Sequence, residues 1–150
     1  MKELTFITGD VFTDQRGSIS FVNGFDMEII KRFYMVEPAH CDIVRAWQGH
    51  QNEQKWFYVV QGSFKIVGVK IDDWNDPSSN LDVHEYNLNQ HSPGILHMPG
   101  GFANGFKANE PGSKLMIFSN FTLQQSASDE YRFNQSKWFD WNNVKIKNND

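Results

Sequence analysis

The stretch WFYVVQGSFKIVGVKI, residues 56–71, decides the fold class of this 150-residue chain. Aromatic and β-branched residues dominate it, and such residues favour β-strands. In its second half, apolar and polar residues alternate, which is the pattern of a strand with one buried face. Gln61 and Gly62 interrupt the run, so we predict two strands, at 56–60 and 63–71, joined as a hairpin.

Similar short runs extend in both directions from this stretch. They predict further strands at 18–22, 29–36, 83–88, 95–98 and 114–121. Clusters of Gly, Pro, Asn and Asp separate the runs and are typical of turns. A polar interruption is expected at 52–55, and an irregular segment from residue 122 onward. Many short strands with frequent turns predict an all-β sandwich or barrel.

Size and composition favour one small domain. A chain of 150 residues fits a single domain, residues 1–150, and its end from about residue 142 is expected to fray. Cys41 is the only cysteine, so no internal disulfide can form. No run reaches the roughly 20 apolar residues that a membrane-spanning helix needs, and no signal peptide is visible. We therefore expect a cytoplasmic protein that does not enter a membrane.

The charge of the chain argues against a nucleic-acid partner. Its net charge is −4, from 14 basic and 18 acidic residues. A general nucleic-acid binder would carry a basic excess. A few local Arg or Lys residues would still suffice to hold a small anion.

Three stretches together carry a family resemblance. They are DQRGSISF (14–21), VRAWQGHQNEQKWFYVVQGSF (44–64) and HMPGGFANGF (97–106). In this order and spacing they resemble the cupins related to dTDP-4-dehydrorhamnose 3,5-epimerase. The middle stretch, with KRFY (31–34) before it, looks more like the sugar 3,4-ketoisomerases of the same superfamily. The resemblance runs from about residue 10 to residue 141.

The resemblance implies a double-stranded β-helix, which is the cupin jelly-roll barrel. It also implies a nucleotide-linked sugar of the dTDP-keto-deoxysugar type in the barrel mouth, a homodimer, and a role in sugar or polysaccharide biosynthesis. The implied chemistry moves a proton on the carbon next to a ketone. Such chemistry needs a base, an acid and groups that stabilise an oxyanion.

Metal-binding cupins hold their ion through two His and one Glu of a first motif and a His of a second. The resemblance places Gln48, His50, Lys55 and Asn104 at these four positions. Only His50 is a ligand of the expected type, and the ammonium of Lys55 is a poor neighbour for a divalent cation. We therefore expect neither a metal nor another cofactor.

Two enzyme types compare differently with the chain. The 3,5-epimerases carry a catalytic His and a Tyr acid, whose places match Gln48 and Phe118, and neither side chain can transfer a proton near neutral pH. The 3,4-ketoisomerases carry R-G-x-H-A-H, and the matching R-A-W-Q-G-H keeps Arg45 and the second His, His50. Tyr34 matches the tyrosine of their K-R-x-Y segment. We expect the 3,4-ketoisomerase type, with a divergent 3,5-epimerase as an alternative.

Two of the matched residues are predicted to be catalytic. His50 would abstract the proton, and Tyr34 would donate a proton or orient His50. Because side chains two apart in a strand share a face, Gln48 would lie beside His50. The predicted substrate-binding residues are Arg45, Gln48, Lys55, Tyr58 and Asn104.

Each binding residue has an expected task. Arg45 and Lys55 would stabilise negative charge, and Gln48 would hold a sugar oxygen. Tyr58 would face the interior and stack on the base or the sugar, and Asn104 would lie in a turn that lines the mouth. A function from another class also stays open, namely a non-catalytic barrel that only binds a nucleotide-sugar.

Overall fold

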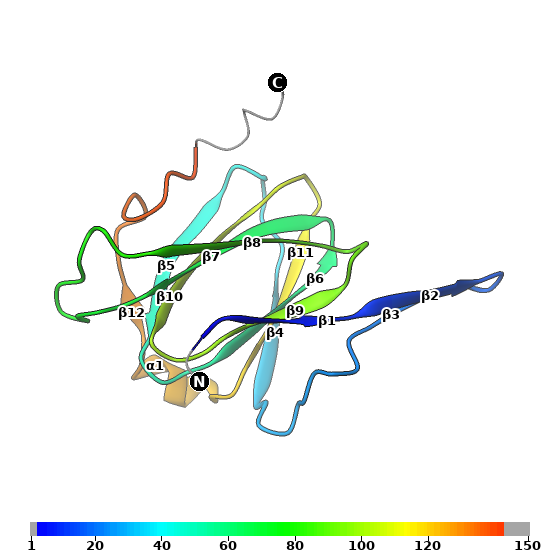
Figure 1. Cartoon of the computed structure of the whole chain (residues 1–150), viewed down its shortest axis with the longest axis horizontal. Coiled ribbons are helices and arrows are strands. Elements are labelled where there is room, and N and C mark those ends of the chain that lie inside the picture. The colour runs from blue at the N-terminus through cyan, green and yellow to red at the C-terminus, as the bar shows by residue number, and fades with distance from the viewer. Residues whose placement is uncertain (1–2, 143–150) are drawn as a thin grey trace.

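The computed structural model of the chain describes residues 3–142, in which β-strands dominate (Figure 1). One five-stranded sheet has the order β1-β9-β6-β11-β4, and a second has the order β12-β5-β10-β7-β8. The first sheet contains β1 (Thr5–Thr8), β9 (Gly94–Met98), β6 (Lys55–Gln61), β11 (Lys114–Ser119) and β4 (Arg32–Val36). The second contains β12 (Tyr131–Arg132), β5 (Val44–His50), β10 (Phe102–Ala108), β7 (Ser63–Lys70) and β8 (Val83–Asn89). The other described elements are β2 (Asp10–Asp14), β3 (Gly17–Phe21) and the helix α1 (Leu123–Ala127).

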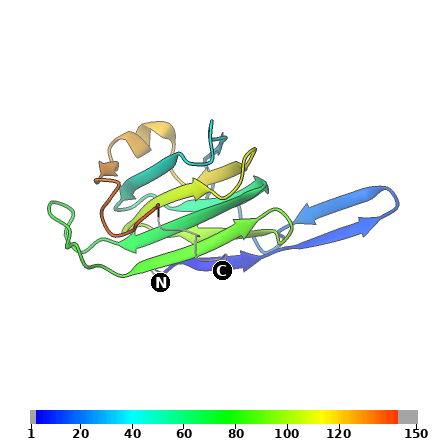
Figure 2. The same ribbon diagram turned by 90° about the horizontal axis from the view of Figure 1, so that it is seen from above.

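From β4 to β12, consecutive strands alternate between the two sheets, except that β7 and β8 are neighbours in one sheet. The sheets are antiparallel and lie one over the other, as Figure 2 shows from above. Such alternation between facing antiparallel sheets is the topology of a jelly roll. The predicted all-β double-stranded β-helix is therefore confirmed.

The predicted hairpin across Gln61 and Gly62 is wrong. β6 pairs with β9 and β11, whereas β7 pairs with β8 and β10, so these two residues form a corner between the sheets. Gly62 has a φ of 76°, and a Cβ at this position would lie 2.1 Å from Oγ of Ser113. The corner thus requires glycine for both its conformation and its space.

The main core lies between the two sheets. Both sheets contribute its fully buried side chains, among them Phe57, Phe64, Ile66, Leu96 and Leu115. The strand period places every second residue of β7 on the opposite face. There a second buried cluster forms against the C-terminal segment, with Trp47, Val67, Val69 and Trp141 among its members.

Two elements that the sequence did not indicate position the site. The glycine-containing strand β10 was expected to be a turn, yet it runs through the middle of its sheet between β5 and β7. Helix α1 falls in the segment expected to be irregular. It begins after Thr122, whose side chain accepts a hydrogen bond from the backbone of Gln125 while the Gln125 side chain bonds back to Thr122. This capping box is a local start signal for a helix.

The hairpin of β2 and β3 projects away from the barrel in both views (Figures 1 and 2). Its residues Phe12 and Ile19 lie opposite each other and are 53% and 62% exposed. A lone two-stranded hairpin is marginally stable in water. The exposed apolar side chains of this hairpin make it a candidate contact surface for another chain. The homodimer stays a prediction.

Two expectations concern the ends of the chain and membranes. The predicted fraying from about residue 142 falls on residues 143–150, which lie outside the described residues. Within residues 3–142, no helix has the length and apolar character needed to cross a membrane. The expected cytoplasmic location stays a prediction.

Candidate functional site

A cavity of about 540 Å³ lies within the barrel. Strands β4, β5, β6, β10 and β11 all contribute lining side chains, and so do α1 and β12. Phe57, Phe106 and Ile117 supply apolar surface, whereas Tyr34 and Asn104 supply polar groups. The volume falls within the range of about 300–1,000 Å³ that is usual for small-molecule sites.

Basic side chains dominate the charge of this cavity. The four that line it are Arg32, Arg45, Lys55 and Arg132, and among the described lining residues the acidic one is Glu130. A hydrogen bond from Arg132 lowers the pKa of Glu130 below its ordinary value, so this carboxylate is already paired. Within residues 3–142, Arg45 has no acidic side chain at salt-bridge distance. This balance suits an anionic ligand such as a phosphate group.

Lys55 and Tyr34 form a hydrogen-bonded pair in the cavity wall. They come from β6 and β4, with β11 between these strands. The ammonium Nζ of Lys55 donates to Oη of Tyr34 over 2.7 Å. Because the phenol oxygen accepts this bond, the phenol can turn its own proton toward a ligand. The pair therefore offers a proton and a positive charge at one place, as an oxyanion requires.

His50 is buried, and its contacts determine its tautomer. Nδ1 lies 2.9 Å from the backbone oxygen of Asp129, which can only accept, so Nδ1 carries the proton. Nε2 is left with a free lone pair and has no hydrogen-bond partner among the described residues. Burial, followed by the charge of Lys55, lowers the pKa of His50 below its ordinary value of 6.5. The ring is thus neutral near pH 7 and holds an acceptor nitrogen, which a general base requires.

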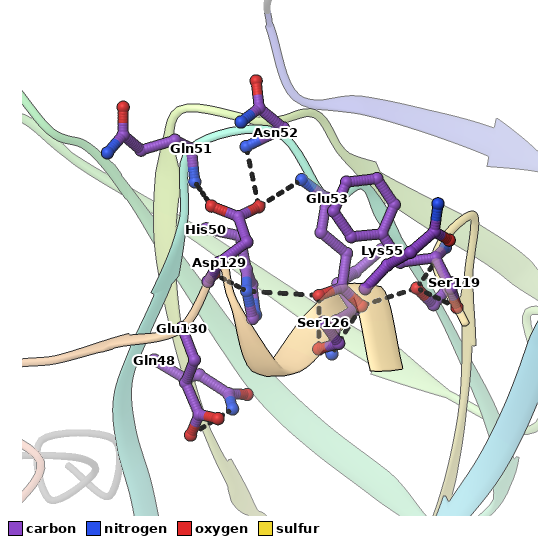
Figure 3. Close-up of polar contacts among 12 residues, drawn as sticks. Gln48, His50, Gln51, Asn52, Glu53, Lys55, Ser119, Ser126, Asp129 and Glu130 are labelled. Atoms are coloured by element: carbon purple, nitrogen blue, oxygen red, sulfur yellow. Dashed lines mark hydrogen bonds and ion pairs between the residues drawn. The ribbon is translucent and has the colours of Figure 1, made fainter. Parts of the chain in front are cut away.

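The carboxylate of Glu53 forms the centre of a polar cluster, drawn in Figure 3. It lies 3.3 Å from Nδ1 of His50 and 3.6 Å from Nζ of Lys55. It accepts hydrogen bonds from Oγ of Ser119 at 2.5 Å and from Oγ of Ser126 at 2.7 Å. Sequence reasoning missed Glu53, since nothing local sets it apart from its neighbours in the predicted polar interruption.

Asp129 anchors the loop between β5 and β6. Its carboxylate accepts hydrogen bonds from the backbone N–H groups of Gln51, Asn52 and Glu53 at 2.9, 2.9 and 2.8 Å (Figure 3). Its own backbone oxygen holds Nδ1 of His50. One residue just after α1 therefore sets both the loop conformation and the tautomer of the histidine.

Most of the predicted site residues meet at the cavity. Those that line it are Tyr34, Arg45, Gln48, Lys55 and Asn104. His50 does not line it, because the ring is buried and only 2% of the residue is exposed. The phenol of Tyr34 contacts Lys55 and not His50, so the expected orienting contact is replaced by an ammonium–phenol pair.

Tyr58 and Asn104 lie elsewhere than expected. Phe57 and Val59, on either side of Tyr58, belong to the core between the sheets, so Tyr58 faces outward. A shift of one residue along a strand reverses the face, which is why the expected inward position of Tyr58 is wrong. Asn104 lies in strand β10 opposite Gln48, and not in a turn.

The position expected to match the tyrosine acid, Phe118, also faces away from the cavity. Its ring packs against those of Phe25 and Phe33, with centroid distances of 5.1 and 5.9 Å. The next residue toward the N-terminus, Ile117, lines the cavity, and Tyr34 lies opposite Ile117 on β4. A phenol is therefore supplied from the adjacent strand.

The side chains at this site do not suit the metal that many cupins hold. Gln48, His50, Lys55 and Asn104 stand at the four ligand positions that the resemblance marks. Nζ of Lys55 is bonded to Tyr34, and Nδ1 of His50 is bonded to the backbone. Two amides and an ammonium are poor ligands for a divalent cation. The chemistry proposed for the site therefore uses side chains alone.

The buried histidines predict a loss of stability on the acid side of neutrality. Burial lowers the pKa values of His50 and His97 below 6.5 in the folded chain. Below pH 6.5 the unfolded chain then binds more protons, so the free energy of unfolding falls as pH drops toward the folded pKa values. We expect urea unfolding curves to show this decline between about pH 6.5 and 5. In a doubly substituted chain, with His50→Asn and His97→Asn, the free energy of unfolding should decline less steeply with falling pH. An equal decline would contradict the assignment of this pH dependence to the two histidines.

No protein-family model matches the chain, and no curated protein matches it. Solved structures do match. The dTDP sugar isomerase of Desulfovibrio desulfuricans G20 has a TM-score of 0.76 at 16% identity, over 97% of this chain and 94% of that one. The RmlC epimerase of Mycobacterium tuberculosis has a TM-score of 0.74 at 18% identity, over 92% of this chain and 74% of that one.

A double mutant of the QdtA 3,4-ketoisomerase from Thermoanaerobacterium thermosaccharolyticum, in complex with TDP, is also similar. Its TM-score is 0.67 at 22% identity, over 89% of each chain. At these identities the likeness concerns the fold. The chain therefore shares the jelly-roll fold of these structures, which is the fold that the sequence motifs predict.

Proposed function

We propose that the chain is an isomerase of a nucleotide-linked keto sugar, of the 3,4-ketoisomerase type, which works by proton transfer next to the ketone. One observation carries the proposal: a neutral histidine with a free Nε2 lies beside a basic cavity whose wall holds the Lys55–Tyr34 pair. The similar structures support the substrate class, since they include complexes with TDP and with TDP-4-keto-6-deoxyglucose.

The proposed reaction consists of two coupled proton movements. Nε2 of His50 takes the proton from C3 of the 4-keto sugar, and the electron pair of that bond forms a C3–C4 double bond as the C4 oxygen gains negative charge. Tyr34 gives its proton to this oxygen, with the charge of Lys55 beside it. The C3 hydroxyl then returns a proton to the Tyr34 phenolate while His50 protonates C4. The product is the 3-keto sugar, and both catalytic residues regain their starting forms.

Substrate binding falls to other lining residues. Arg45, which lines the cavity without an acidic partner among the residues described, would hold the diphosphate, because a guanidinium matches phosphate oxygens in charge and geometry. Gln48 and Asn104 lie opposite each other on β5 and β10, and in this proposal they hold sugar oxygens. Tyr58 has no part in this arrangement.

The burial of His50 favours a second candidate function. Nε2 of His50 is buried, so turnover requires the cavity to extend to this atom when substrate binds. If the cavity does not extend to Nε2, the chain is a non-catalytic cupin that binds a nucleotide-sugar without contact to the buried ring. The 3,5-epimerase alternative has less support, because Gln48 cannot act as a base and Phe118, which matches the tyrosine acid, has no hydroxyl and packs away from the cavity.

Incubation with dTDP-4-keto-6-deoxyglucose in heavy water distinguishes these functions. We expect a 3-keto product that carries deuterium at C4, and recovered 4-keto substrate that carries deuterium at C3, detected by NMR and mass spectrometry. Label at C5 would indicate a 3,5-epimerase instead. Measurable binding with neither product nor label would contradict the isomerase and leave the binding module. A parallel incubation without protein corrects for spontaneous exchange.

A further inference from the structure

Glu53 is a fully buried carboxylate that the proposed reaction does not use. Its side chain has no solvent exposure. Removing a carboxylate from water is costly unless hydrogen bonds and opposite charges replace the hydration. Side chains of five elements supply them, namely Arg32 of β4, His50 of β5, Lys55 of β6, Ser119 of β11 and Ser126 of α1.

The two oxygens of this carboxylate face different parts of the site. Oε1 lies 3.3 Å from Nδ1 of His50, on the side of the base. Oε2 lies 3.6 Å from Nζ of Lys55 and 3.4 Å from Nη2 of Arg32. Lys55 in turn donates to Tyr34. A single carboxylate therefore joins the base to the ammonium–phenol pair.

We propose that Glu53 is a positioning residue which stabilises the protonated form of His50 during turnover and holds Lys55 against Tyr34. This inference rests on the proposed isomerase function. When His50 accepts a proton, Lys55 opposes the new charge, and a carboxylate beside Nδ1 offsets that repulsion. The carboxylate of Glu53 lies 3.3 Å from Nδ1 of His50 and 3.6 Å from Nζ of Lys55. Glu53 can therefore stabilise both cations without moving.

The other acidic groups near His50 are less free to take this part. The carboxylate of Asp129 already accepts three backbone hydrogen bonds from the β5–β6 loop. Glu130 is paired with Arg132 and bonded to Gln48. Of the charged groups around the ring, Glu53 is the acid that contacts Nδ1 directly.

The substitution Glu53→Gln removes the charge while nearly keeping the shape of the side chain. We expect the pKa of His50, followed by NMR of the ring nitrogens, to fall by about one pH unit. We also expect kcat to fall about 100-fold with little change in KM. The acid limb of the profile of kcat against pH should move to lower pH, because His50 then stays unprotonated at lower pH.

Ser119→Ala is the matched control. It removes a 2.5 Å hydrogen bond from the same carboxylate but leaves the contacts to His50 and Lys55. We expect Ser119→Ala to lower the free energy of unfolding about as much as Glu53→Gln does, while the pKa of His50 stays nearly unchanged. If both variants move that pKa equally, or if Glu53→Gln leaves it unchanged, Glu53 is only a structural group and the proposal fails.

Two further results separate this proposal from the proposed function. If Glu53→Gln does not fold, Glu53→Asp, which keeps the charge but withdraws it from Nδ1, should lower the pKa of His50 by a smaller amount. An unchanged pKa in that folded variant would overturn the proposal. If the wild-type chain shows no isomerisation but the NMR shifts occur as expected, the coupling stands and the isomerase function fails.

Discussion

The substitution His50→Asn is expected to lower the turnover of a keto-sugar nucleotide by about 100- to 10,000-fold while nucleotide binding persists. The amide of Asn can still donate to the backbone oxygen of Asp129, which Nδ1 of His50 contacts at 2.9 Å. It cannot accept a proton from carbon, because an amide has no useful basicity. The measurements are kcat for isomerisation and a calorimetric titration with TDP.

His97→Asn is the control for this experiment. His97 also has a pKa lowered by burial, but its ring stacks on Trp56 at 4.7 Å and bonds to Gln54, away from the cavity lining. We expect turnover to persist in this variant. Unchanged turnover in His50→Asn would refute the assignment of the base, and a loss of TDP binding together with turnover would point to a structural role.

The substitution Asp129→Ala is expected to cost about 4 kcal/mol of unfolding free energy. The side chain is buried and accepts three backbone N–H bonds from the loop between β5 and β6. Its removal leaves these donors unsatisfied in a part-buried setting, which is more costly than losing bonds that water can replace. Urea denaturation of both proteins measures the difference.

Asp73→Ala is the matched control for Asp129→Ala. Asp73 also accepts a backbone hydrogen bond within a loop, from Asn75, but it is exposed, so water can replace it. We expect a loss of less than about 1 kcal/mol for this variant. Equal losses in the two variants would mean that the loop is not held by the carboxylate of Asp129.

Local patterns predicted the fold class but not the strand pairing. The alternation in residues 63–71 shows that this strand has two faces of different character. The two faces are the same whichever strands it pairs with, so the alternation does not identify its partners. The connection at Gln61 and Gly62 looked like a hairpin because glycine suits both a tight turn and a corner between sheets. Which one forms depends on β9, β10 and β11, and these strands lie far along the chain.

The candidate site divides in a similar way. Motif matching indicated Arg45, Gln48 and Lys55, which line the cavity. Arg45 and Gln48 are three residues apart and would face opposite ways in a regular strand. The register shift between β5 and β10, which leaves Trp47 without a partner on β10, brings both to the interior.

Motif matching placed Tyr58 on the wrong face. Alternate residues of a strand face opposite sides, and a motif match does not by itself show which of the two sets faces the interior. Glu53 was missed, because the burial of a carboxylate depends on the donors that five other elements bring to it.

The sequence by itself determined the all-β class, the cupin resemblance and the polar candidates Arg45, Gln48 and Lys55. These follow from local alternation and from motifs in a given order. Only the tertiary structure decided that Nδ1 of His50 carries the proton, that Glu53 joins His50 to Lys55, and that the Gly62 connection crosses between sheets. Each of these depends on contacts between groups from separate strands or segments, and such contacts exist only once the two sheets have closed on each other.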